Sequence, residues 1–267
     1  MDKTKLLDKR GADKEDRLLL AKVLDRAEQS HSRNIPASTD FLSPQQRVMA
    51  QELLHLAGIP ETACAALGGY EGAERTILLF LPDWLEAEDA QSQSPLRFLR
   101  ASFRKEYHLT HRDFLGSLMG MGIVREKVGD ILVGEDEADL IVLDSVALFL
   151  LESWISAGRA KLTVSEIPGE YLHIPQVRCE EVRDTVSSLR LDAVLAQTLH
   201  LSRARAQALI RGGAVQKNWQ ITDRTDAEIA QGDVLSIRGS GRICVHSVQG
   251  ESRKGRLFLE VETFLRP

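Results

Sequence analysis

Cationic side chains recur at helical spacing between residues 203 and 211 of this 267-residue chain. Arg203, Gln207 and Arg211 are four residues apart, so on an α-helix they stack along one edge, with Arg205 on the opposite flank of the apolar arc. Guanidinium groups on a helix edge suit phosphates and ribose hydroxyls. The spacing therefore predicts a helix edge that attracts a polyanion.

Two short helices are predicted to hold this edge in place. Apolar residues recur at i, i+3, i+4, i+7 and i+8 over residues 191–199, which indicates one buried helical face. Ser202 stands where a second helix needs an N-cap, and Gly212 with Gly213 ends that helix. The core-facing positions are Leu191, Val194, Leu195, Thr198 and Leu199 in the first helix, and Ala206, Leu209 and Ile210 in the second.

The pattern from Arg190 to Val215, RLDxxLAxxLxLSRxxAxxLIxxGxV, closely resembles the S-four (αL) RNA-binding module. The family usually follows its valine with a V-N-G type turn, whereas this chain has Gln216-Lys217-Asn218-Trp219, so the loop tip departs from the pattern. The resemblance implies RNA binding. We expect the contacts to come from Arg190, Ser202, Arg203, Arg205, Gln207, Arg211 and Lys217.

Short strands are predicted after the two helices. Residues 227–229, 232–238 and 257–261 alternate or cluster as strands do, and Gly239, Gly241, Gly250 and Gly255 are expected in turns. They would form the small sheet that completes the module.

The charge of the chain is unevenly distributed. Residues 183–267 contain 13 Lys and Arg against 9 Asp and Glu, a formal charge of +4, whereas the other 182 residues carry −9, which together give −5 for the chain. A polyanion would be attracted to the C-terminal part, and the acidic remainder limits indiscriminate binding.

A second motif lies in the middle of the chain, where residues 111–123 read HRDFLGSLMGMGI. Gly116 and Gly120 share a helix face that another backbone could approach, and Gly122 is expected to end the helix. Two interpretations stay open, a nucleic-acid patch or a solvated face with helix-packing glycines. The residues of a second RNA contact would be Arg97, Arg100, Arg104, Lys105, His111 and Arg112.

The remaining elements predict a multidomain α+β protein with a helical N-terminal region (1–74), a mixed α/β middle domain (75–168) and the S-four module (184–267). Helices are expected over 12–30 and from Ser43-Pro44 to Leu56, and the apolar run 76–81 is expected to open the middle domain. That domain should alternate strands at 96–103, 130–133, 139–142 and 161–164 with helices at 112–119 and 145–155. A ferredoxin or RNA-recognition-motif topology fits, but the aromatic base-stacking strand of that motif is missing.

The middle motif, together with the C-terminal pattern, closely resembles the YlmH-type RNA-binding proteins of bacteria and plastids, over most of the chain. The resemblance implies a translation factor that binds structured rRNA or tRNA on a large ribosomal subunit carrying stalled peptidyl-tRNA, in ribosome-associated quality control. Genes of this family also occur in the neighbourhood of cell-division genes. A cell-division adaptor, which would bind protein partners through the acidic N-terminal region, therefore stays open as an alternative.

The sequence lacks the complete motifs of the enzyme classes that we considered. Arg190-Leu191-Asp192 partly matches the catalytic aspartate context of pseudouridine synthases, but it falls inside the first helix of the module, so synthase activity is only a remote alternative. There is no P-loop, nucleophile elbow or metal-ligand set, and the acidic run Gly134–Asp139 is expected to be a hairpin turn. The three cysteines are far apart and expected to be reduced, buried thiols. We expect a non-enzymatic monomer without cofactor, metal or small-molecule substrate.

The N-terminus lacks an apolar segment after its charged residues, and no run of about 18 apolar residues occurs, so we expect a cytoplasmic protein without a membrane anchor.

Overall fold

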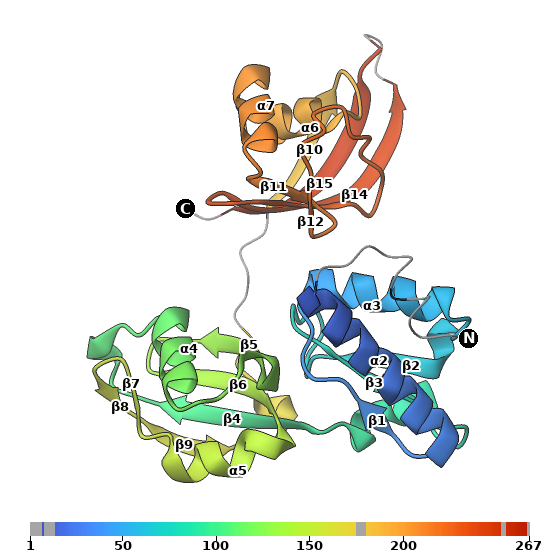
Figure 1. Ribbon diagram of the computed structural model, residues 1–267. Helices are drawn as coiled ribbons and strands as arrows, with labels where there is room; N and C mark the ends of the chain where they lie inside the picture. The colour runs from blue at the N-terminus through green and yellow to red at the C-terminus, as the bar shows by residue number, and fades with distance from the viewer. Residues whose placement is uncertain (1–6, 8–13, 175–179, 252–254, 266–267) are drawn as a thin grey trace. The chain divides into compact units, whose positions relative to one another are not determined.

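The computed structural model describes residues 7, 14–174, 180–251 and 255–265, and the chain divides into two compact units, residues 1–175 and 176–267 (Figure 1). The first unit contains an N-terminal region and a middle region, and the second contains a helix pair with a sheet. This arrangement confirms the predicted α+β fold class. Each unit has its own apolar core.

The N-terminal region packs two helices against a small antiparallel sheet of order β1-β3-β2. Its elements are α2 (Lys14–Arg33), β1 (Ala37–Ser38), α3 (Pro44–Leu56), the 3-10 turn η1 (Glu61–Ala63), β2 (Cys64–Leu67) and β3 (Ile77–Phe80). Ser43 caps α3 through a reciprocal capping box with Gln46, and Pro44 occupies the first turn, so the predicted start of this helix is confirmed. The three-stranded sheet adds to the expected helices.

Strand β3 belongs to the N-terminal region, which corrects the expectation that residues 76–81 open the middle domain. Ala37 and Cys64 both pair with Phe80, so β3 is the central strand between β1 and β2. All four β3 residues are buried. An apolar run of this length indicates a buried strand, but it does not reveal which sheet the strand joins.

The middle region follows a β-α-β-β-α-β order, and its four main strands form an antiparallel sheet of order β5-β6-β4-β9. This is the ferredoxin-like topology that RNA-recognition motifs share, as the sequence predicted. The elements are η2 (Ala87–Gln93), β4 (Leu96–Ser102), η3 (Lys105–Tyr107), α4 (His111–Gly120), η4 (Arg125–Lys127), β5 (Val128–Val133), β6 (Glu137–Leu143), α5 (Asp144–Ser153), the hairpin β7 (Ser156–Ala157) and β8 (Ala160–Lys161), β9 (Thr163–Glu166) and η5 (Gly169–Tyr171).

The two faces of this sheet are both covered. Phe114 of α4 and Leu150 of α5 pack with Leu140 on one face. On the other face, Ile141 packs in a cluster with Phe41, which comes from the N-terminal region. The face on which an RNA-recognition motif stacks bases is therefore buried here by the protein itself.

The first residues of β5, which follow the glycine-rich motif, help to join the two regions of this unit. Asp130 accepts hydrogen bonds from the Tyr70 hydroxyl at 2.9 Å and from the backbone N–H of Arg75 at 3.1 Å. The guanidinium of Arg75 donates to the carbonyls of Phe41 and Val128. Burial and the nearby charge of Arg125 lower the pKa of Arg75 to about 10, so it stays charged at neutral pH.

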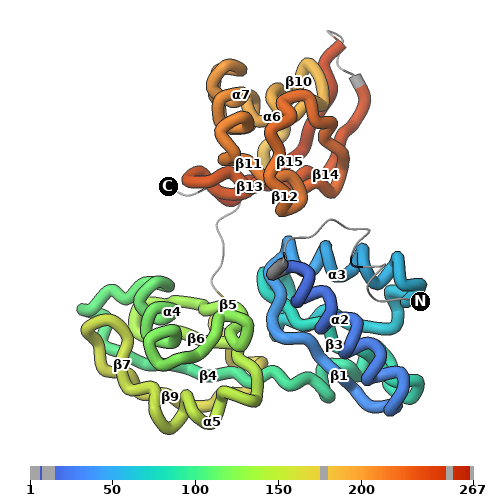
Figure 2. Tube along the Cα trace, in the orientation of Figure 1, coloured from blue at the N-terminus to red at the C-terminus, as the bar shows by residue number. Residues whose placement is uncertain are grey.

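The C-terminal unit has a sheet of order β10-β15-β14-β13-β11-β12 and two helices, α6 and α7. Figure 2 shows β10, from the start of the unit, beside β15, from its end. The bounds are β10 (Glu180–Val186), α6 (Leu191–Thr198), α7 (Arg203–Arg211), β11 (Val215–Lys217), β12 (Gln220–Ile221), β13 (Val234–Ile237), β14 (Gly241–Glu251) and β15 (Leu257–Leu265). Both helices and the inner faces of the strands supply its core.

Two expectations about these strands were wrong. Residues 227–229 form no strand but a single bridge between Glu228 and Arg190. All four glycines have positive φ, but Gly241 and Gly250 belong to the long strand β14, near its two ends. Gly239 and Gly255 lie outside the strands, as predicted. A glycine pattern alone does not separate a turn from an irregular strand, and β14 contains two register shifts against β15.

Within the described ranges, no helix is long and apolar enough to cross a membrane, and no group of His, Cys, Asp or Glu residues could hold a metal ion. The acidic segment after β5 forms the predicted hairpin turn, closed by a hydrogen bond from Gly134 N–H to the Glu137 carbonyl. Cys64 and Cys244 are half-buried free thiols, and Cys179 lies outside the described residues.

Gly116 of the middle motif and Gly129 of β5 provide a matched test of the fold. A Cβ at Gly129 would meet the Phe41 ring at 2.7 Å, whereas a Cβ at Gly116 would meet nothing within 4 Å. We predict that Gly129→Ala destabilises the first unit by about 1–3 kcal/mol through overpacking, and that Gly116→Ala stabilises it by up to about 1 kcal/mol. Urea denaturation measures both. Equal effects of the two substitutions would contradict the packing described here.

Candidate nucleic-acid interface

The C-terminal helix pair is organised around a fully buried carboxylate, Asp192, in the first turn of α6. Arg203 of α7 contacts both of its oxygens, through Nε at 3.1 Å and a terminal nitrogen at 3.0 Å. Gln207, one helical turn further along α7, donates to it at 2.7 Å. Arg190, the residue just before α6, donates a further hydrogen bond of 3.2 Å to the same carboxylate.

The start of α6 is fixed by backbone hydrogen bonds from outside the helix. The N–H groups of Leu191 and Asp192 donate to the carbonyls of Ala227 and Thr225. These are N–H groups that a helix leaves without a partner in its first turn. The loop before β13 thus caps α6 and holds Asp192 at a defined position.

Burial is the strongest single influence on Asp192 and by itself raises the pKa of its carboxyl. The hydrogen bonds from Arg203, Gln207 and Arg190 outweigh burial and hold the pKa below its usual range. Asp192 is therefore ionised at neutral pH, and the same contact raises the pKa of Arg203. Asp192 is thus fully buried, and both of its oxygens accept hydrogen bonds within the helix pair.

Ser202 has the predicted role of N-cap of α7. Its hydroxyl accepts a hydrogen bond from the backbone N–H of Arg205 at 3.2 Å, and its backbone is extended. The helix ends at Arg211, and Gly213 adopts a positive φ of 66° just after it, as a glycine can.

The polar side chains that were predicted to make α7 cationic, on its edge and on the opposite flank, have two different roles. Arg203 and Gln207 turn toward Asp192, so they brace the helix pair. Arg205 and Arg211 are exposed, and within the described ranges neither side chain has a hydrogen-bonding or ionic partner. These two guanidinium groups are available to an incoming ligand.

Arg238, which the sequence reasoning missed, lies close to the end of α7. Its backbone N–H donates to the carbonyl of Ala214, three residues beyond Arg211, and its side chain is exposed. The negative end of the helix dipole stabilises the Arg211 cation at the end of α7. Arg211 and Arg238 together place two exposed positive charges near this end, and positive charges attract phosphate. The hydrogen bond between residues 238 and 214 places Arg238 near α7, and the sequence alone does not show this proximity.

Lys217 is placed differently from the expectation that it contacts RNA. Its ammonium donates to the Glu228 carbonyl at 2.6 Å and pairs with Asp233 at 2.9 Å. Asn218 and Trp219 form the following tight turn, both with positive φ. Lys217 therefore fastens the hairpin of β11 and β12 to the loop that caps α6.

The middle-region candidates also separate into paired and available side chains. Arg100 forms a bidentate ion pair with the buried Asp139, with both bonds at 2.7 Å, and also donates to the Tyr171 carbonyl. Its side chain is only 18% exposed and is held by Asp139, which disfavours the expected RNA contact of Arg100. Arg97 pairs with Glu166 and Arg104 with Glu106, both at exposed positions.

The first half of the glycine-rich motif remains accessible. Lys105, His111 and Arg112 are exposed. Burial and the charge of Arg125 lower the pKa of His111. Gly116 and Gly120 face open space, so they are not helix-packing glycines, whereas Gly122 ends α4 with a φ of 84° as predicted.

Comparison with known proteins agrees with this geometry. The family model "YlmH, N-terminal" matches residues 15–83, "Putative RNA-binding domain in YlmH" matches 97–171, and the S4 domain, the S-four module, matches 189–235. The ribosome-associated protein quality control protein P2 of Bacillus subtilis is 36% identical over 219 residues, which are 82% of this chain and 83% of that protein. The chain belongs to the YlmH family.

A solved structure, the cell division protein ylmH from Streptococcus pneumoniae, covers 61% of this YlmH-family chain and 97% of its own, with a TM-score of 0.49 and 25% identity. Both the middle and the C-terminal parts of the chain match RNA-binding families, which confirms the two resemblances seen in the sequence.

We predict that Asp192→Asn destabilises the C-terminal unit of this YlmH-family protein by about 2 kcal/mol at pH 7, because the charge-assisted hydrogen bonds are lost. The pKa of Asp192 is lowered by folding, so its contribution is fully present well above the unfolded value of about 3.9 and is lost as the pH falls through the folded value. The stability gap between wild type and variant should narrow below about pH 4. Urea denaturation across pH measures it, and a gap independent of pH would contradict the ionised carboxylate.

Ser202→Ala should cost about 1 kcal/mol of stability through the lost cap, whereas Ser202→Thr, which keeps the hydroxyl, should cost less. Thermal melting compares the two. A wild-type melting curve for Ser202→Ala with a large loss of RNA affinity would instead identify Ser202 as a direct RNA ligand.

Proposed function

We propose that this protein is an RNA-binding translation factor that grips structured rRNA or tRNA on a large ribosomal subunit carrying stalled peptidyl-tRNA. The observation that carries the proposal is the exposed pair Arg205 and Arg211 on α7, a helix braced from beneath by the Asp192 contacts. The name of the Bacillus subtilis relative, a ribosome-associated quality control protein, supports the ribosomal setting.

Recognition depends mainly on shape and charge. The major groove of A-form RNA is too narrow for side chains, so guanidinium groups on a helix edge meet phosphates and ribose hydroxyls. Arg203 pairs with the Asp192 carboxylate, so only the solvent-exposed side of its guanidinium can contact RNA. Arg190 pairs with the same carboxylate and is limited in the same way. Arg205, Arg211 and Arg238 form no ion pair with any residue that the structure describes, so their guanidinium groups supply the contacts to RNA.

The middle region contributes a second, weaker contact through Lys105, His111 and Arg112, with Arg104 at the rim. Because the sheet face used by RNA-recognition motifs is covered by the N-terminal region, this contact is made from the side of α4. Two modest sites in one chain reinforce each other through their effective concentration.

The protein acts without chemistry of its own, as a cytoplasmic monomer that needs no cofactor, metal or small-molecule substrate. Asp192, the residue nearest to a catalytic context in the sequence, is committed to structure. The N-terminal region covers one face of the middle sheet, the middle region makes the second RNA contact, and the S-four module makes the first.

We predict that the double variant Arg205→Ala, Arg211→Ala binds ribosomal RNA more weakly and flattens the slope of log affinity against log salt by about 1.4–1.8, since each phosphate contact contributes about 0.7–0.9. Arg224→Ala is the matched control, because Arg224 lies in the same unit but pairs with Asp226. Fluorescence anisotropy over a salt series gives both slopes. An unchanged slope in the double variant would show that α7 does not face the RNA.

Sedimentation through sucrose at low salt tests the ribosomal setting. The wild type should travel with large subunits, and the double variant should remain at the top of the gradient. If the wild type also stays at the top while large subunits pellet, the translation-factor proposal fails and the cell-division adaptor becomes the better explanation.

A further inference from the structure

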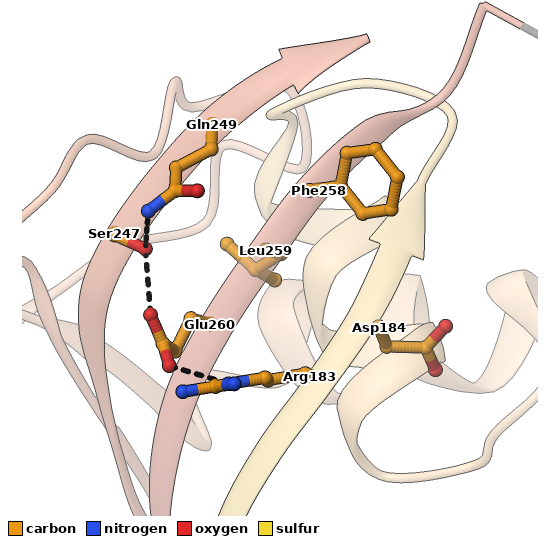
Figure 3. Close-up of a pocket in the computed structure, with 7 residues that line it drawn as sticks. All are labelled: Arg183, Asp184, Ser247, Gln249, Phe258, Leu259 and Glu260. Carbon is orange, nitrogen blue, oxygen red and sulfur yellow. Dashed lines mark hydrogen bonds and ion pairs between the residues drawn. The ribbon is translucent and has the colours of Figure 1, made fainter. Parts of the chain in front are cut away.

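A pocket of about 240 Å³ lies on the sheet of the C-terminal unit (Figure 3). Three adjacent strands line it with Arg183 of β10, Phe258 and Glu260 of β15, and Ser247 and Gln249 of β14. Phe258 is 49% exposed, which is unusual for an aromatic residue in the middle of a sheet.

The strand register places these side chains on one face. Phe258 is opposite both Thr185 and Gln249, and Glu260 is opposite both Arg183 and Ser247. Side chains alternate along a strand, so the neighbouring Leu259 and Val261 point to the other face, where they pack in the core with α6 and α7. The side chains of Phe258, Glu260 and Gln249 therefore lie on the face of the sheet away from α6 and α7. Asp184 and Leu259 also line the pocket.

The carboxylates at this pocket already have partners. Glu260 accepts from Arg183 at 2.6 Å with one oxygen and from Ser247 at 3.0 Å with the other. Asp184 accepts from Gln197 at 2.6 Å and from the backbone N–H of Thr185 at 2.6 Å. A cationic peptide would find little unpaired negative charge here.

Hydrogen-bonding capacity remains on two other side chains. The Gln249 amide makes one long bond of 3.4 Å to Ser247 through its nitrogen, and its oxygen accepts no bond from the described residues. Arg183 uses only Nε, and its side chain is 77% exposed, so its terminal nitrogens are free to donate. An apolar ring thus lies beside an amide with donor and acceptor and a planar guanidinium.

From this combination we infer that the pocket binds one unpaired RNA base, stacked on Phe258 with its edge toward Gln249. A nucleobase is planar and carries donors and acceptors on its edge, which this set matches, and aromatic residues on exposed sheets are a general platform for such bases. Arg183 covers the base or its phosphate. The inference rests on the proposed function, since it adds a single-stranded contact to a protein that grips structured RNA at α7.

The test uses the full-length protein and two labelled probes, an adenylate RNA decamer and a decamer with the same backbone but no bases. Base stacking is worth about 1–3 kcal/mol per base, so one stacked base should make the adenylate decamer bind about 5- to 150-fold more tightly than the abasic one. Phe258→Leu should remove this preference without changing the salt slope, because stacking releases no counterions.

The controls separate the two sites. Phe149→Leu, a similarly exposed phenylalanine at 45% in the first unit, should keep the preference. Arg205→Ala with Arg211→Ala should weaken binding of both decamers and flatten the salt slope. Gln249→Ala, at an exposed position that cannot disturb the core, should reduce the preference even if Phe258→Leu unfolds.

Each outcome decides a different point. If neither decamer binds and structured RNA does not bind either, the proposed function fails. If both decamers bind equally with a normal salt slope, or if Phe258→Leu and Phe149→Leu behave alike, RNA binding stands and the base pocket is refuted. If adenosine monophosphate displaces the decamer as well as an unlabelled decamer does, the pocket is a free-nucleotide site and the RNA assignment is overturned.

Discussion

The C-terminal unit depends on the neutralisation of one buried carboxylate. An ionised Asp192 without partners would be strongly destabilising in an apolar core, so the surrounding chain has to supply donors in fixed positions. Arg203 and Gln207 are brought to it only when α7 packs on α6 at one register. The same requirement therefore specifies the helix pair and orients the cationic edge of α7.

A comparable constraint operates in the first unit, where Asp139 is buried on the face of the middle sheet that the N-terminal region covers. Arg100 neutralises it and also bonds the Tyr171 carbonyl, and the N–H of His173 donates to the same carboxylate at 2.7 Å. These bonds fasten the segment after β9 over the sheet. The ferredoxin-like topology is thus retained, while the face that RNA-recognition motifs use for binding packs against the N-terminal region.

Local sequence patterns were sufficient where the structure depends on neighbouring residues. The periodicity of residues 191–199, the Ser202 cap and the glycine at 213 are all local, and the structure has them where they were predicted. The order of strands and helices in the middle region was likewise predictable from alternation.

Residue roles that depend on long-range pairing were not predictable from one sequence. Arg100 and Asp139 meet only through the register of β4 and β6, 39 residues apart, so a basic stretch looked like a surface patch. Gly129 is needed because Phe41 packs against its backbone, and Arg238 reaches α7 through a bond to Ala214. The helix-packing role of Gly116 and Gly120 failed for the same reason, since spacing alone does not show whether a second element is present.

The central claim is that RNA is held by α7 of the C-terminal unit. Ultraviolet crosslinking of the tagged protein in cells, with sequencing of the RNA and mass spectrometry of the crosslinked peptides, tests it most directly. We predict that reads concentrate in large-subunit rRNA and tRNA and that crosslinked peptides include residues 203–211. Reads spread over messenger RNAs, or crosslinks confined to the first unit, would contradict the account.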